Sequence, residues 1–352
     1  MNRRFPLFIS VLMTMAACLS PADIRIDESD AGGRVVISGQ VSTLSGRTFA
    51  ELGLTTSTGS RPVAVPGAEV ELVENNAFRY TLIDHPERPG VYVLNGFTGI
   101  PGTTYHLEAQ LPDGRTYRSA DEVLPVTSGT DDISHSFELV ENIDADGALV
   151  QDARIRIETK PQLPGSGQRF FKWSVEEVFL IRPTDFPDPF GYVPPDCFVT
   201  QPVDPQRVVL FDGRAFTGQF PEPQLLATRN TDKSFYYKHY FTTYLSSMTE
   251  TAFDYWLKVR VVASQSGSIF DTPPAIVEGN VDGPGGSPVY GYFQSVNETF
   301  SRFSIQRTDL PPYAFLNEYC DFSYERNYDK YPGECLDCIK YRNSSYLRPD
   351  WF

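Results

Sequence analysis

Short stretches of alternating apolar and polar residues, separated by glycine and proline, fill the chain between residues 34 and 118. They predict seven short strands, at residues 34–41, 50–56, 62–73, 78–83, 90–94, 104–110 and 115–118. Two-residue alternation is typical of strands with one buried face. Pro112, Asp113 and Gly114 stand between the last two stretches and favour a tight turn. We therefore expect an immunoglobulin-like or transthyretin-like β-sandwich over residues 34–130.

The chain after residue 130 continues the β pattern in longer segments and contains one helical segment. Alternation predicts strands at residues 153–159, 169–181 and 235–245. The sequence from Ser247 to Glu250 has the pattern of a capping box and predicts a helix over residues 249–263. The apolar stripe of this helix is interpreted as core packing and consists of Met248, Ala252, Tyr255, Trp256 and Val259. The expected fold is mostly β: a sandwich, then a larger β-rich domain over residues 131–352 with one helix and a disulfide-bearing C-terminal tail.

Composition agrees with this architecture and narrows the function. The 352 residues suffice for two domains, and they include 28 Pro, 26 Gly and 13% aromatic residues. Such a composition favours short strands joined by turns over helical bundles. The formal net charge of −15 at pH 7 argues against nucleic acid as a partner, because phosphate backbones bind basic surfaces.

The N-terminal residues carry the pattern of a bacterial lipoprotein signal. Arg3 and Arg4 precede an apolar run that is too short for a membrane-spanning helix. Cys18 follows two alanines and resembles the acylated cysteine of a lipobox. We expect a signal peptide at residues 1–17, lipidation at Cys18 and an acidic tether at residues 18–33, with an ordinary secretory signal as the alternative. Acyl chains would tether the protein to a membrane. The acidic stretch resembles the surface-export signals of Bacteroidota lipoproteins, which implies exposure at the surface of the outer membrane, with a solvated linker as the alternative.

The other four cysteines are disulfide candidates. Cys197, Cys320, Cys335 and Cys338 form an even set, and an exported protein meets an oxidising compartment. The sequence leaves all three pairings open. Two cysteines separated by two residues also suit a zinc site or a redox motif, but further zinc ligands and a thioredoxin-like context are missing. We therefore expect structural disulfides.

Known enzyme motifs are absent from the sequence. It contains no G-x-S-x-G, H-E-x-x-H, phosphate-binding or dinucleotide-binding glycine motif. The four histidines lack metal-ligand spacing, and we interpret His239, inside an aromatic run, as a packed strand residue. Residues 142–147 match the start of a calcium loop, but Ala153 stands where its closing acidic ligand should be. We expect no catalytic residue, cofactor or metal, although a working pair among 45 acidic residues stays open.

Several motifs in the second half of the chain occur in an order that resembles a known family. The motif residues are Trp256, Gly267, Phe270, Asp271, Pro273, Pro274, Gly279, Asn280, Gly291, Tyr292, Phe293, Pro349 and Trp351. Together they resemble a family of Bacteroidota outer-membrane lipoproteins with a domain of unknown function, over residues 18–352. Genes of that family commonly neighbour TonB-dependent transporters. The resemblance therefore implies a location and a partner, but no catalytic residues.

Three functional hypotheses follow from these observations. The first is a non-catalytic accessory or substrate-capture partner of a TonB-dependent transporter, with a small peptide or glycan as ligand. The second is a structural or adhesive cell-surface module, which the sequence does not separate from the first. The third is a hydrolase of surface glycans or peptides, which the missing motifs disfavour.

Overall fold

The fold is mostly β, as the sequence predicts, with disulfides in its C-terminal region. The structure is a computed structural model that describes residues 33–56, 62–143, 147, 149–162, 164, 169–183, 195–215, 222–264, 277–286, 289–312, 314, 320 and 332–352. The predicted signal and Cys18 lie outside the described residues, as do five motif residues: Gly267, Phe270, Asp271, Pro273 and Pro274.

The N-terminal strands form a two-layered sandwich, which we call the N-terminal unit. They are β1 (Val35–Ser42), β2 (Phe49–Leu54), β3 (Val63–Ala64), β4 (Glu69–Glu74), β5 (Phe78–Asp84), β6 (Val91–Val93), β7 (Thr104–Gln110), β8 (Thr116–Ser119) and β9 (Glu122–Val123). The predicted turn at Gly114 is confirmed, since β7 and β8 pair across it. Alternate residues such as Ile37, Leu72 and Tyr105 are fully buried between the layers.

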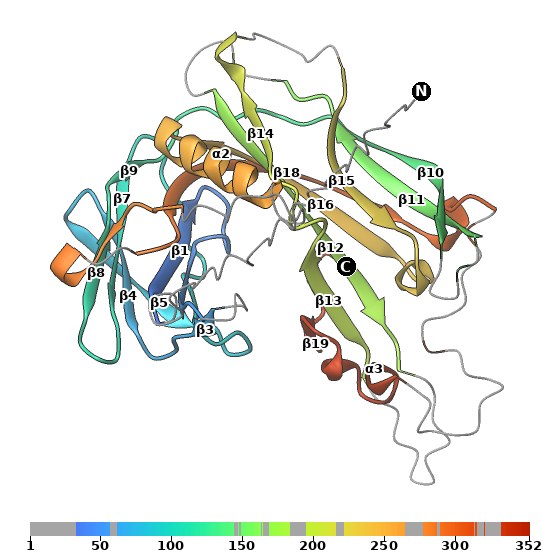
Figure 1. The fold of residues 1–352 in the computed structure, drawn as a ribbon, viewed down its shortest axis with the longest axis horizontal. Helices are drawn as coiled ribbons and strands as arrows, with labels where there is room; N and C mark the ends of the chain where they lie inside the picture. Colours follow the sequence, from blue (N-terminus) through green and yellow to red (C-terminus); the bar gives the residue numbers. More distant parts are fainter. Residues whose placement is uncertain are drawn as a thin grey trace, which may run out of the picture.

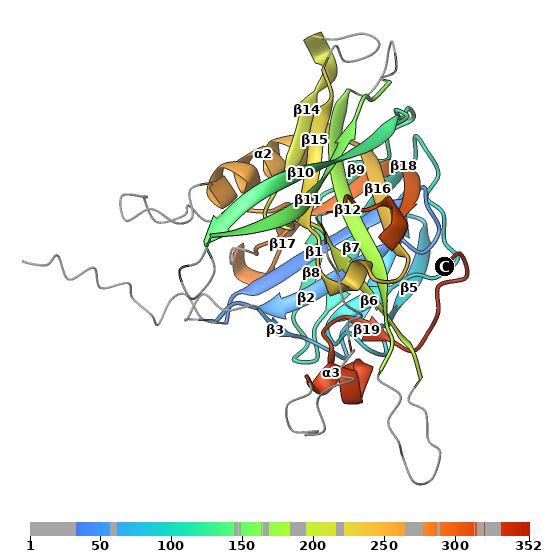
Figure 2. The same ribbon diagram turned by 90° about the vertical axis from the view of Figure 1, so that its right-hand side faces the viewer.

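The remaining strands form a second layered body, the C-terminal unit. One sheet contains β10 (Ile133–Ile143), β11 (Leu149–Thr159) and β15 (Gln224–Asn230); the other is built on β12 (Phe170–Ile181), β13 (Cys197–Pro202), β14 (Val209–Asp212), β16 (His239–Met248), β18 (Phe293–Ile305) and β19 (Ser344–Ser345). Figure 2 shows β10 and β11 crossing in front of β12 and β16. Ile155, Trp173 and Phe241 fill the core between these layers.

A parallel strand pair joins the two units into one bent sheet (Figure 1). β1 of the N-terminal unit pairs with β18 from Gly39↔Phe293 to Ser42↔Val296. Just before β18, the chain enters the N-terminal unit as β17 (Val281–Asp282), which pairs with β8. Val281 and Phe293 belong to the core of that unit. The junction is therefore built by residues far apart in the sequence.

The predicted helix is confirmed as α2 (Glu250–Ser264), which lies across the junction in Figure 1. Thr249 caps it, because its Oγ1 accepts a hydrogen bond of 3.2 Å from the Ala252 N–H. The capping box expected from Ser247 is wrong, since β16 extends through that residue. A second, short helix is α3 (Gly333–Leu336). Among the described helices, none combines the length and apolar character needed to cross a bilayer.

Single 3-10 turns complete the regular structure. They are η1 (Gly213–Ala215), η2 (Lys233–Phe235), η3 (Pro284–Gly286), η4 (Arg307–Asp309) and η6 (Cys338–Lys340).

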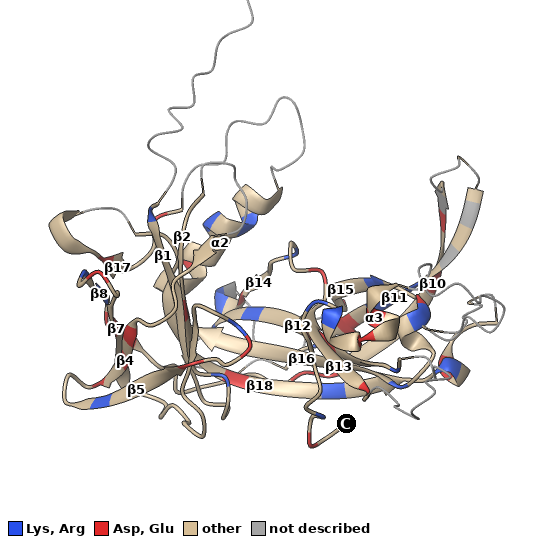
Figure 3. Cartoon of the chain, turned by 90° about the horizontal axis from the view of Figure 1, so that it is seen from below, with Lys and Arg blue, Asp and Glu red and all other residues tan. Residues whose placement is uncertain are grey.

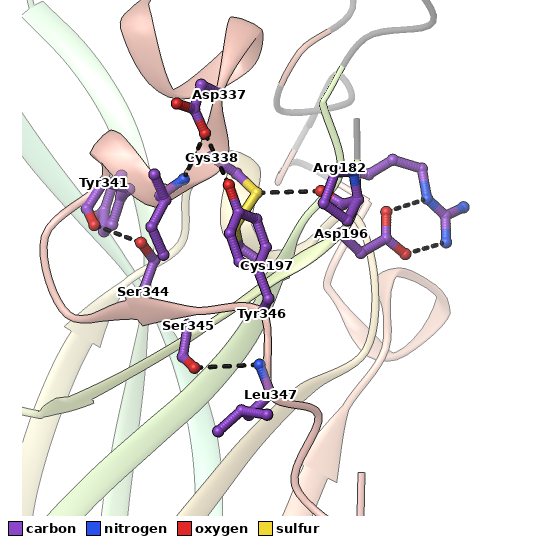
Figure 4. The surroundings of a disulfide bond; sticks show 12 residues. Arg182, Asp196, Cys197, Asp337, Cys338, Tyr341, Ser344, Ser345, Tyr346 and Leu347 are labelled. Atoms are coloured by element: carbon purple, nitrogen blue, oxygen red, sulfur yellow. Dashed lines mark hydrogen bonds and ion pairs between the residues drawn. A yellow bond between two sulfur atoms is a disulfide. The ribbon is translucent and has the colours of Figure 1, made fainter. Parts of the chain in front are cut away.

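One disulfide fastens the C-terminal tail to β13, and a second closes a loop within the tail. Cys197 pairs with Cys338 and Cys320 pairs with Cys335, which confirms structural disulfides and leaves no free thiol in the C-x-x-C motif. Figure 4 shows Tyr346 beside this region, where its hydroxyl donates a hydrogen bond of 3.0 Å to Asp337. The tail thus follows β13 as a fixed part of the C-terminal unit.

Candidate functional site

One face of β12, β16 and β18 carries polar and charged side chains in cross-strand rows. The rows, set by the pairing register, are Lys172–Ser246–Glu298, Ser174–Tyr244–Phe300 and Glu176–Thr242–Arg302. We call the surface formed by these nine residues the inner face. Residues at alternate positions, such as Trp173 and Leu245, point to the other side and pack in the core. The inner face is therefore the side of this sheet that is not occupied by the three-stranded sheet.

Three other parts of the chain border the inner face. Trp256 of α2 stands at one end. Trp351 of the tail stands at the other, with the Arg302 Cζ 3.5 Å from the centroid of its ring. From the N-terminal unit, the Arg47 Cζ lies 3.5 Å from the centroid of the Tyr244 ring. Figure 3 shows positive and negative segments interspersed along the strands of this sheet.

A pocket of about 750 Å³ opens where the inner face meets the N-terminal unit. Glu176 contributes from β12, residues 85–88 line it from the N-terminal unit, and residues 339–345 line it from the tail. The Oγ of Ser345 lies 3.5 Å from a carboxylate oxygen of Glu87 and links the two sides. Both units are therefore needed to form the pocket.

Glu298 is the buried centre of the junction between the units. Its carboxylate accepts hydrogen bonds from Arg47 Nε at 3.0 Å, from Ser246 Oγ at 2.8 Å and from Ser42 Oγ. Gln40 adds a further donor at 3.4 Å. Burial alone would lower the pKa of Arg47, but the charge of Glu298 and its hydrogen bond hold that pKa above the usual value. The Glu298 oxygens are thus fully engaged within the protein.

Lys172, in the same row as Glu298, lacks such a partner. Lys172 as a residue is half-buried, and its ammonium lies 3.5 Å from the centroid of the Trp256 ring, whose Nε1 donates a hydrogen bond of 2.7 Å to Gln294. Within the described residues, Lys172 makes no hydrogen bond and no ion pair. Burial lowers its pKa to about 8, and the nearby Arg47 acts in the same direction, while Glu298 opposes them.

Glu176 is the corresponding isolated anion, four positions further along β12. It is half-buried, and its one contact in the part of the chain that the structure describes is the Tyr244 hydroxyl at 3.5 Å. Burial raises the pKa of Glu176, an effect that the charges of Arg47, Arg88 and Arg302 partly offset. Neither Glu176 nor Lys172 therefore has its charge compensated by a direct ion pair among the described residues.

Four motif residues meet behind α2, at or beside the buried carboxylate of Glu122. The Tyr292 hydroxyl and the Thr249 hydroxyl donate hydrogen bonds to it, the latter at 2.7 Å, and Asn280 Nδ2 lies 3.5 Å away. Gly279 and Gly291 allow the close backbone contact beside this cluster: a Cβ on Gly279 would lie 1.5 Å from the Gly291 carbonyl oxygen. These motif residues therefore hold α2 against the N-terminal unit.

A fully buried histidine cluster lies on the core side of the same sheet. His239 Nε2 is 3.0 Å from Glu177, and its Nδ1 is 3.4 Å from Ser234 Oγ. Although the residue types match a hydrolytic triad, the Ser234 hydroxyl donates to Asp232 and all three are nearly inaccessible to solvent. His239 is indeed a packed strand residue, stacked 4.0 Å from the Phe235 ring centroid.

Glu177 is charged in this cluster in spite of its burial. Burial raises its pKa, but hydrogen bonding from His239 and the charges of His239 and Arg229 bring the pKa below its usual value. Elsewhere in the described part of the chain, no three or more His, Cys, Asp or Glu side chains are arranged to hold a metal ion.

The described motif residues lie in three places: the cluster around Glu122, the borders of the inner face and the C-terminal tail. Trp256 and Trp351 border the inner face, and Trp351 contacts Tyr240 and Arg302. Pro349 forms a turn in the tail with Phe352.

The charged residues of the inner face were not singled out from the sequence. Their signal was the alternation of Lys172 and Glu176 with apolar neighbours in one strand.

Comparison with known proteins identifies a family without an assigned activity. The family described as "Domain of unknown function (DUF4249)" matches residues 20–302. A search of curated proteins gave no match. A solved structure titled "Biofilm associated protein - BSP domain" has 8% identity and a TM-score of 0.14, over 79% of this chain and 60% of that chain. The chain thus spans less than two thirds of that structure's length, and so low a TM-score establishes no common fold.

Proposed function

The chain belongs to the family described as Domain of unknown function (DUF4249), and on that premise we propose that it is a lipid-anchored, non-catalytic capture protein. It binds a small ligand on the inner face and passes it to a TonB-dependent transporter in a Bacteroidota-type outer membrane. The observation that carries this proposal is the pair of half-buried residues Lys172 and Glu176 on one face of β12, neither of which has an ion pair among the described residues. Unpaired charges in a partly desolvated surface are costly unless a ligand compensates them.

The geometry of the inner face favours binding over hydrolysis. Glu176 and Glu298 are two strands and two rows apart, which separates their backbones by about 16 Å at usual sheet spacings. Hydrolysis by two carboxylates uses a separation of about 5–10 Å between them. Glu298 is also saturated by hydrogen-bond donors and has no free capacity for acid–base chemistry.

The lipid anchor in this proposal is Cys18, which follows the apolar run and two alanines. Several acyl chains on one cysteine attach a protein stably to a bilayer. The acidic residues after it, Asp23, Asp27, Glu28 and Asp30, suit either a surface-export signal or a solvated tether. An anchored body of this kind would stay close to a membrane transporter.

Two linked measurements test the proposal. The full-length tagged protein is labelled with palmitate in cells beside a Cys18→Ala variant, and each is then purified after cross-linking. We expect the label only on the wild type and a TonB-dependent β-barrel transporter in its cross-linked material. Equal labelling of both proteins would refute the anchor. Repeated purification without any transporter would instead support an adhesive or structural module.

A further inference from the structure

We propose that the inner face binds a short peptide with free termini, about four residues long, with its carboxylate on Lys172 and its ammonium on Glu176. This inference rests on the proposed capture function and names the ligand class of the same surface. It is carried by three features: a cation and an anion that have no ion pair among the described residues, their spacing along β12, and the exposed Ser174 midway between them.

The carboxylate end is defined by Lys172. Its ammonium has three N–H donors, and its direct contact among the described residues is the face of the Trp256 ring, which attracts the charge without accepting a conventional hydrogen bond. Glu298 cannot serve as the acceptor, because Arg47, Ser42, Ser246 and Gln40 already occupy its oxygens. A ligand carboxylate would supply the missing acceptor at this end.

The ammonium end is defined by Glu176. Its carboxylate lines the pocket between the units and receives one long hydrogen bond, from the Tyr244 hydroxyl at 3.5 Å. The surrounding cations act on it from a distance, since Arg302 Nε donates to Thr242 at 2.8 Å and its guanidinium stacks on Trp351. A primary ammonium group has the charge and the donors that Glu176 lacks.

The spacing between the two charges fits an extended peptide. Lys172 and Glu176 are four positions apart on one strand, which corresponds to about 13 Å between their backbones. An extended tetrapeptide spans about the same length from its ammonium to its carboxylate. Midway between the ends Ser174 is exposed, and in the same row, two strands away on β18, Phe300 is 50% exposed and offers an apolar contact.

Other ligand classes fit this surface less well. A neutral glycan could stack on the aromatic rings, but it would leave both charges uncompensated. An acidic glycan would satisfy Lys172 and place another negative charge near Glu176. A peptide with free ends satisfies both charges at once, in a chain whose own net charge is −15.

The test measures binding of Ala-Phe-Ala-Ala to the full-length protein in detergent by calorimetry. Three forms are compared: the free peptide, its C-terminal amide and its N-acetyl derivative. A charge-assisted contact of this kind corresponds to about a tenfold to hundredfold change in Kd. We expect each blocked form to bind the wild type at least tenfold more weakly than the free peptide.

Variants assign the two ends. In Lys172→Met, the amide and the free acid should bind equally, and in Glu176→Gln, the acetylated and free peptides should bind equally. Lys258→Met, at an exposed position of α2, serves as the control and should keep both differences. The comparison of peptide forms on the wild type remains valid even if a variant folds poorly.

Two results would overturn the inference. One is equal binding of blocked and free peptides to the wild type. The other is binding of neutral or acidic oligosaccharides, abolished by Lys172→Met, with no peptide binding. In the second case the capture function stands and the peptide assignment fails, whereas failure of the anchor and transporter tests would leave peptide binding unaffected.

Discussion

The side chain of Asn280 and the backbone of Phe293 form two reciprocal hydrogen bonds. Asn280 Nδ2 donates to the Phe293 carbonyl at 2.8 Å, and the Phe293 N–H donates to Asn280 Oδ1 at 2.9 Å. The amide side chain thus satisfies the backbone of the first residue of β18, beside the place where β1 joins it. Both residues belong to the family motifs, which in this protein stabilise the junction between the units.

Replacement of Asn280 by alanine should weaken this junction. The variant leaves a buried N–H and a carbonyl of Phe293 without their partner, and we expect a loss of about 1–3 kcal/mol in unfolding free energy. Urea unfolding measures the change. Asn95→Ala, at an exposed turn position, is the matched control and should stay within about 0.5 kcal/mol of the wild type. Equal effects at the two positions would contradict the structural role of Asn280.

Substitution of Gly291 by alanine should destabilise the protein more than the same substitution at Gly114, which has the same φ angle. Gly291 and Gly114 both have φ of +88°, but a Cβ on Gly291 would lie 2.3 Å from the Ile37 carbonyl oxygen, while Gly114 has open space. Gly114→Ala therefore reports the conformational penalty alone, about 1–2 kcal/mol. Gly291→Ala should exceed it clearly in urea unfolding, and similar losses in both variants would refute the close-contact explanation.

The buried carboxyl of Glu122 should make stability depend on pH in a defined direction. Burial raises its pKa above the usual 4.5, although hydrogen bonds from Tyr292 and Thr249 oppose this. The unfolded chain therefore loses this proton at a lower pH than the folded protein. Relative to Glu122→Gln, the wild type should lose unfolding free energy as pH rises from 4.5 through the raised pKa, and then level off.

The contribution of Glu177 to unfolding free energy should change with pH in the opposite direction to that of Glu122. Its folded pKa is lowered, so its contribution is present above the unfolded value and is lost as pH falls through the folded one. Relative to Glu177→Gln, the wild type should therefore gain stability with rising pH in the acid range. Urea unfolding at several pH values measures the difference in unfolding free energy between the wild type and each variant. If both differences changed with pH in the same direction, the opposite pKa shifts of Glu122 and Glu177 would be contradicted.

The sequence predicted local structure well because strands, turns and α2 have local signals. Alternation located β7, the turn at Gly114 and β8, and helical spacing located α2 to within one residue at each end. The cap was misplaced by two residues, since nothing local shows that β16 continues through Ser247. Pairing between distant strands has no such local signal.

The candidate site depends on that distant pairing, and this is why the sequence alone did not find it. Lys172, Ser246 and Glu298 form one row although about 50–70 positions separate neighbours in the sequence. The same holds for His239 and Glu177, which are 62 positions apart. The strand from Phe170 to Ile181 did contain a clue, since Lys172 and Glu176 alternate with Trp173 and Val175, which pack in the core.

The two disulfides should differ in their effect on stability. The Cys197–Cys338 bond closes a segment of 141 positions, and the Cys320–Cys335 bond closes one of 15. On chain entropy alone, replacing the first pair by alanine should cost about 2 kcal/mol more than replacing the second. Urea unfolding tests the order, and trypsin should release the tail faster from the first variant. The reverse order would show that local packing outweighs chain entropy.

Lys172 should titrate far below an ordinary lysine. With a pKa of about 8, half of its amine is uncharged at pH 8, whereas an ordinary lysine with a pKa near 10.4 has less than about 1% in that form. Acetic anhydride reacts with the uncharged amine, and mass spectrometry of peptides measures labelling at each position. Because partial burial slows the reaction, the pH midpoint is the relevant reading, and exposed Lys258 is the control. The midpoint of Lys172 should lie near pH 8. A midpoint equal to that of Lys258 would mean that the ammonium is solvated and needs no ligand partner.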